Sequence, residues 1–214
     1  MSRIFFTLAC LALVLMVVTL SVGLSLGQLK PQLEQLQVLS TGAAAAAAQR
    51  ASPVDDEVLA EIALLEGVKK RANAHRLLGI ATGVLVLLVN CLAVTYFVGT
   101  ARWCREVVEA YQLDGTLFGR SARMKRGAFF WAVIGMLTIL TISSLGAMSD
   151  PMAAFANGEQ YVTPHLIAAM LGVGLIAWSF LAQWQHILDH HDVIEEVLAA
   201  VQKIRAERGL DVAS

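Results

Sequence analysis

Charged side chains are absent from four long stretches of this 214-residue chain. All 16 basic and 17 acidic residues lie outside the stretches, which comprise residues 4–29, 77–101, 127–149 and 160–188. A helix of about 20 apolar residues crosses the ~30 Å hydrocarbon core of a bilayer, and each stretch is longer than that. We therefore expect an all-α integral membrane protein whose four spanning helices form an up-down-up-down bundle.

The same absence limits the function. Pathways for ions or protons through a bilayer usually contain an ionisable side chain, and these spans offer no carboxylate and no lysine. A secondary transporter is disfavoured further because the chain shows neither an internal repeat nor paired broken helices. The spans retain three notable polar groups, Asn90, Tyr96 and Gln183, and we expect these to form hydrogen bonds between helices.

The composition leaves no room for a separate soluble catalytic domain. With 57% hydrophobic and 15% charged residues, we expect residues 1–214 to form a single membrane domain. A net charge of −1 provides no field that attracts nucleic acid. Cysteine is also scarce, and no outer loop contains one. We interpret Cys10, Cys91 and Cys104, in the spans or at their inner edge, as small core residues.

The distribution of lysine and arginine predicts the orientation. If the N-terminus is inside, the inner segments hold ten basic residues and the outer loops hold six, all six in the first loop. Inner segments of membrane proteins are enriched in basic residues. We therefore expect both termini to be cytoplasmic, in a bacterial inner (plasma) membrane.

The outer segment 30–76 is expected to form a helical hairpin that projects from the bilayer. Ser52-Pro53-Val54-Asp55 combines an N-cap serine with proline at the first helical position, which is a helix-start signal. Apolar residues recur on both arms at helical spacing, and the arms meet near residues 49–53. At 1.5 Å per residue, arms of about 20 residues would extend roughly 30 Å. The alanine run 43–48 could instead be a low-complexity spacer.

The C-terminal segment 189–214 is expected to continue the fourth helix into the cytoplasm and to stop at Gly209. It carries one apolar stripe, formed by Val193, Val197, Val201 and Ile204. A stripe of this kind needs a partner. The inner helix 102–113, another protomer or a different subunit could cover it.

Two histidines near the outer membrane face suggest a haem site. His75 opens the second span and His165 opens the fourth, and parallel helices of a bundle can hold one haem b iron between two imidazoles. Arg76 could then bind a propionate. The alternative is that the histidines lie at helix ends near headgroups and that Arg76 anchors its span.

A second histidine group lies at the inner end of the fourth helix. His186, Asp189 and His190 resemble the H-x-x-E-H arrangement of inverted zinc peptidases, with aspartate in place of the glutamate, and could hold a metal ion. The third ligand and the catalytic domain of such a peptidase are missing. The alternative is a set of polar residues where the helix leaves the bilayer.

These observations favour a non-catalytic polytopic membrane protein. We expect an accessory or scaffold subunit that contacts membrane lipids and associates with other membrane-protein subunits or with itself. The alternative is a small b-type cytochrome or quinone-reactive membrane-anchor subunit with one haem between His75 and His165.

Overall fold

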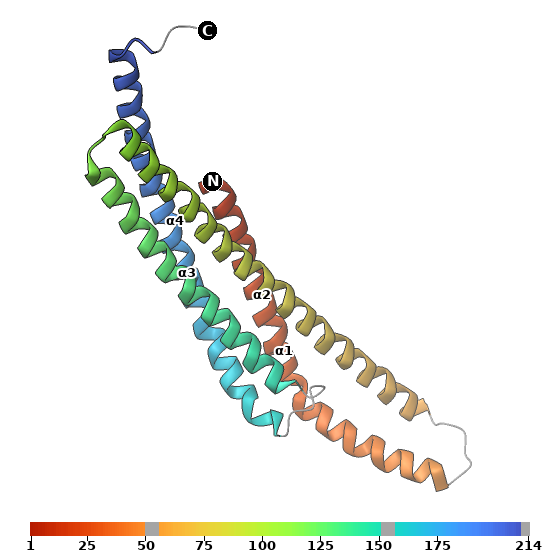
Figure 1. The fold of residues 1–214 in the computed structure, drawn as a ribbon. Helices are drawn as coiled ribbons and strands as arrows, with labels where there is room; N and C mark the ends of the chain where they lie inside the picture. Colours follow the sequence, from red (N-terminus) through yellow and green to blue (C-terminus); the bar gives the residue numbers. More distant parts are fainter. Residues whose placement is uncertain (50–55, 151–156, 211–214) are drawn as a thin grey trace. The chain divides into compact units, whose positions relative to one another are not determined.

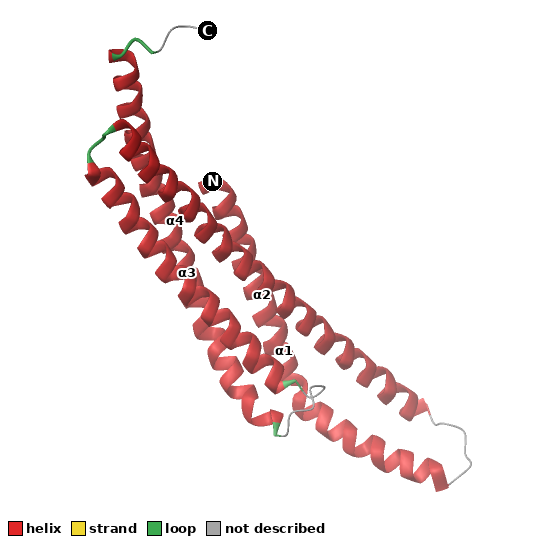
Figure 2. Ribbon diagram, viewed as in Figure 1, coloured by secondary structure: helices red, strands yellow, loops and turns green. Residues whose placement is uncertain are grey.

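The computed structural model describes residues 1–49, 56–150 and 157–210; within 28–65 it describes the backbone and, of the side chains, only that of Ala63. The described residues form four long helices, α1 (Ser2–Gln49), α2 (Asp56–Tyr111), α3 (Gly115–Ser149) and α4 (Val162–Glu207) (Figure 1). A short 3-10 helix, η1 (Gly158–Tyr161), precedes α4. The described residues include no strand (Figure 2). The all-α prediction is confirmed.

All four helices are long and apolar enough to cross a membrane. They are also longer than a bilayer requires, because the 56 residues of α2 extend about 84 Å at 1.5 Å per residue. The charge-free stretches therefore occupy only part of each helix. The fold is consistent with a membrane protein that has four spans.

The chain divides into two compact units. Unit 1 comprises Met1–Leu13 and Gly83–Ser214, and unit 2 comprises Val14–Thr82. In unit 1, α3 and α4 lie side by side (Figure 1). Small residues allow this close approach: a Cβ added to Gly172 of α4 would collide with Ile142 of α3. In unit 2, Thr19 of α1 and Thr82 of α2 share a hydrogen bond of 3.0 Å between their hydroxyl groups.

The turn between α2 and α3 contains a left-handed residue and a helix cap. The second helix ends at Tyr111, and Gln112 adopts a left-handed conformation with φ of 57°. Asp114 then caps α3, because its carboxylate accepts a 2.9 Å hydrogen bond from the backbone N–H of Thr116. The hydrogen bond lowers the pKa of the Asp114 carboxyl. The pair Asp114-Gly115, a sequence typical of turns, thus lies at the boundary between the two helices.

The predicted helical continuation of the fourth span is confirmed for the described part of the chain. Helix α4 continues beyond residue 188 to Glu207, and Gly209 follows with φ of +65°. The stripe residue Val197 packs in a buried cluster with Cys104 and Val108 of α2. The C-terminal part of α2 is therefore the partner of this part of the stripe.

The prediction for the cysteines is only partly correct. Cys104 is fully buried, as expected for a core residue. Cys10 and Cys91 are exposed on α1 and α2, so their interpretation as core residues is wrong. Lipid and protein core are both apolar, and the residue type alone does not distinguish the two environments.

Candidate functional site

The first polar cluster joins three helices within the apolar stretches. Gln183 of α4 donates from Nε2 to Oδ1 of Asn90 on α2, at 2.9 Å. Ser179 of α4 donates from its hydroxyl to the backbone carbonyl of Trp131 on α3, at 2.7 Å. Gln183 also donates to the Ser179 hydroxyl, at 3.0 Å, which connects the two contacts. The predicted interhelical hydrogen bonds of Asn90 and Gln183 are confirmed.

A glycine provides the space for this cluster. A Cβ added to Gly135 of α3 would lie 2.9 Å from Asn90 Oδ1 and 3.1 Å from Ser179 Oγ. A polar atom that lacks a hydrogen bond in apolar surroundings costs free energy. The two amides and the hydroxyl therefore bond to one another. One acceptor is left over, because Gln183 Oε1 is buried and has no hydrogen-bond partner. The cluster is thus a helix-joining contact with one unsatisfied oxygen.

The second polar cluster surrounds His190, two residues beyond the fourth charge-free stretch. Its Nε2 lies 2.8 Å from Ser121 Oγ of α3, and its Nδ1 lies 3.4 Å from the Tyr96 hydroxyl of α2. Phe97 packs against the imidazole with a ring-centroid distance of 5.2 Å, edge to face. In either neutral tautomer one ring nitrogen donates and the other accepts, so both neighbours can be satisfied. Burial lowers the pKa of His190 to about 4.

A serine hydroxyl at this distance from an imidazole is the arrangement of a nucleophile and its base. The burial of both side chains excludes that interpretation here. The exposed fractions of Ser121 and His190 are both 0%, so no substrate reaches the hydroxyl. The contact joins α3 to α4, and sequence reasoning missed Ser121 because a lone serine near a basic segment carries no distinctive pattern.

The polar side chains next to His190 on α4 have separate surroundings. His186 packs against Gly127 of α3, and Asp189 is exposed. His191 lies at the surface, 3.4 Å from Glu195. The described residues contain no group of three His, Cys, Asp or Glu side chains that could hold a metal ion. The structure therefore does not bring His186, Asp189 and His190 together as a ligand set.

His165 packs between α4 and α3 in unit 1. Its Nδ1 donates to the backbone carbonyl of Ile142, at 3.1 Å, and its ring lies against Gly146, where an added Cβ would approach to 2.9 Å. Because the carbonyl can only accept, Nδ1 carries the proton and Nε2 keeps its lone pair in the neutral ring. This tautomer is the one that a metal-ligating histidine with a carbonyl partner adopts.

His75 belongs to unit 2 and has a similar neighbour. A Cβ added to Gly23 of α1 would lie 2.8 Å from the His75 ring. Arg76 donates to Oδ1 of Asn73, at 2.6 Å, on its own helix. Each predicted haem ligand therefore lies against a glycine of an adjacent helix. Close helix packing accounts for these positions, and the haem site stays a prediction.

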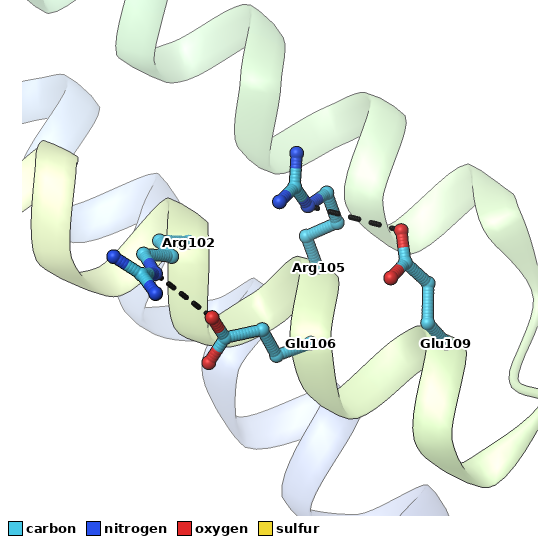
Figure 3. Close-up of polar contacts among 4 residues, drawn as sticks. All are labelled: Arg102, Arg105, Glu106 and Glu109. Atoms are coloured by element: carbon cyan, nitrogen blue, oxygen red, sulfur yellow. Dashed lines mark hydrogen bonds and ion pairs between the residues drawn. The ribbon is translucent and has the colours of Figure 1, made fainter.

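Near the turn between α2 and α3, several charged side chains form ion pairs. Arg102 pairs with Glu106 at 2.8 Å and Arg105 with Glu109 at 3.7 Å, each one turn apart on α2 (Figure 3). Exposed pairs of this kind contribute little to stability. Arg120 differs, because it reaches from α3 to Glu196 of α4.

Comparison of the chain with known protein families, curated proteins and solved structures gives no match.

Proposed function

We propose that the protein is a non-catalytic membrane subunit that acts by association, as an accessory or scaffold component. Its partners are other membrane-protein subunits or further copies of the same chain. In this proposal both termini are cytoplasmic, and residues 30–76 project from the opposite face of a bacterial inner membrane as a helical hairpin.

The main support for this proposal is that the buried polar side chains bond to other helices. The six buried polar residues of the described chain all bond to a neighbouring helix; they are Thr82, Asn90, Ser121, Ser179, Gln183 and His190. A transporter or an enzyme needs some polar groups that face a substrate or a water-filled path. In this chain they stabilise helix contacts instead, which favours a structural role.

Helix length also supports association. The helix α1 runs about 20 residues past its charge-free stretch, and α2 begins about 20 residues before its own, so each extends roughly 30 Å beyond the span. Isolated helices are marginal in water and gain most of their stability by packing an apolar face. The spacing of apolar residues in the sequence predicts such a face, or apolar seam, on each extension; the seams include Leu33 and Leu36 on one arm and Val58 and Ile62 on the other.

The test is the mass of the complex in a mild detergent, measured by light scattering with the detergent contribution subtracted. We expect a mass well above the 23.0 kDa of one chain. A Val58→Ser/Ile62→Ser variant should lower it, because both changes place hydroxyls on the apolar seam. Glu57→Gln/Glu61→Gln, off the seam on the same helix, is the matched control. A wild-type protein that is monomeric in several mild detergents, and that is isolated from its native membrane without any other subunit, contradicts the proposal.

Reporter fusions test the orientation separately. Fusions at Gly115 should report the cytoplasm, and fusions at Gly158 should report the outside. The motive is the ten-to-six asymmetry of basic residues. The reverse pattern would require both termini to lie outside.

A further inference from the structure

A shallow groove on α3 combines cations with an apolar wall. It is lined by Lys125, Arg126, Phe129, Phe130, Val133 and Ile134. The polar residues lie at one end and the apolar residues follow along the helix. The third charge-free stretch starts at Gly127, directly after the two basic residues. The groove therefore spans the boundary between the charged part of α3 and its charge-free stretch.

The two cations of the groove have no carboxylate partner in the part of the chain that the structure describes. Lys125 Nζ instead lies 5.8 Å from the centre of the Phe129 ring, and Arg126 is exposed. Helix α3 contains no acidic residue over its whole length. Arg120, by contrast, is neutralised by Glu196. The groove thus presents two uncompensated positive charges.

The apolar wall of the groove is long enough to contact part of an acyl chain. Ile134 lies eight residues beyond Arg126, which corresponds to about 12 Å along the helix axis. Phe130 is 60% exposed, and its ring packs against Trp131 with a centroid distance of 5.4 Å. Trp131 in turn contacts Trp178 of α4. Aromatic and aliphatic side chains thus continue directly below the cations, as expected where acyl chains lie.

We propose that this groove is a binding site for an anionic phospholipid. The phosphate and the acidic headgroup bind Lys125 and Arg126, and one acyl chain lies along Phe130, Val133 and Ile134. Charge complementarity identifies the ligand, because paired cations over an apolar surface attract a lipid with net negative charge more than a zwitterionic one. A second copy of the chain is a poorer occupant, because it would bring the same cations to the contact. This site is independent of the subunit role proposed above.

Quenching of tryptophan fluorescence by brominated lipids tests the site. The full chain, with Trp103 and Trp184 replaced by phenylalanine, is reconstituted in phosphatidylcholine vesicles that contain a fixed fraction of brominated phosphatidylglycerol or brominated phosphatidylcholine. Trp131 and Trp178, beside the groove, then report the local lipid. We expect an association constant for phosphatidylglycerol on the order of tenfold above that for phosphatidylcholine, since each basic residue near the surface attracts anionic lipid.

Two double variants distinguish binding in the groove from a general effect of positive charge. Lys125→Gln/Arg126→Gln should abolish the preference, whereas Arg105→Gln/Arg123→Gln removes the same charge from positions that do not line the groove and should retain most of it. For the wild type, high salt should weaken the preference, and inorganic phosphate at matched ionic strength should not compete more than chloride does. Strong competition by phosphate indicates a phosphate-ion site and overturns the lipid assignment. Equal quenching by the two lipids in the wild type also overturns it, whatever the variants do.

Discussion

Ser121 Oγ and His190 Nε2 lie 2.8 Å apart, and the side chains that carry them are both fully buried. The pair joins α3 to α4, and the hydroxyl of Tyr96 adds α2 through the other ring nitrogen at 3.4 Å. One imidazole thus bonds to two neighbouring helices where the fourth charge-free stretch ends. A neutral ring satisfies both contacts, but a protonated ring has two donors and no charge partner among them.

We predict that stability falls in acid because of His190. Its pKa is lowered to about 4 by burial, whereas an unfolded chain has a histidine pKa near 6.5. Between these values the unfolded state binds the additional proton, so the stabilising effect of the neutral ring is complete above about pH 6.5 and declines toward pH 4. The unfolding temperature of the detergent-solubilised protein, measured from pH 8 to pH 4, should follow this course.

A second histidine, His191, provides the control for that titration. His190→Gln should flatten the profile over this range, although the variant starts from a lower stability. His191→Gln, at the exposed position beside Glu195, should leave it unchanged. An unchanged profile in His190→Gln would show that another group is responsible.

The helices could be predicted from the chain because exclusion of charge is a property of whole segments. The end of α4 was predictable too, since Gly209 adopts the left-handed conformation that glycine tolerates at a helix end. The contacts of Ser121 and Ser179 could not be predicted, because they depend on which helices are neighbours. For the same reason the exposure of Cys10 and Cys91 could not be read from apolar runs. Patterning identifies an apolar helix, but not the side that faces lipid.

Two glycines should respond in opposite ways to replacement by alanine. At Gly135 an added Cβ would approach the Asn90 amide at 2.9 Å, so Gly135→Ala should destabilise the protein by about 1–3 kcal/mol, as overpacking does. At Gly174 no atom lies within 4 Å of the added Cβ. Gly174→Ala should be neutral or stabilising by up to about 1 kcal/mol, because alanine favours helix. Unfolding in mixed micelles measures both variants, and equal effects would contradict the packing described at Gly135.

The hydrogen bond between Gln183 and Asn90 should appear as a coupling energy. A double-mutant cycle with Gln183→Leu and Asn90→Ala isolates the pair, because the separate packing losses cancel. Interhelical hydrogen bonds in membranes contribute about 0.6 kcal/mol on average and at most about 1.7 kcal/mol. We expect a value in this range. The leucine also removes the unpartnered Gln183 Oε1, which offsets part of the cost of that single change. A coupling energy of zero would mean that the two amides do not bond in solution.

The haem hypothesis has a spectroscopic test. Two imidazoles on different helices of a bundle would hold one haem iron between them. If His75 and His165 hold that position, protein from haem-replete cells shows a low-spin Soret band and a reduced α-band, and His75→Ala or His165→Ala removes the low-spin spectrum. The Nδ1 contact of His165 with the Ile142 carbonyl leaves Nε2 as its ligand atom. His186→Ala, which changes a histidine at the opposite end of the fourth charge-free stretch, should keep the spectrum. A colourless wild-type protein refutes the haem and leaves the association proposal in place.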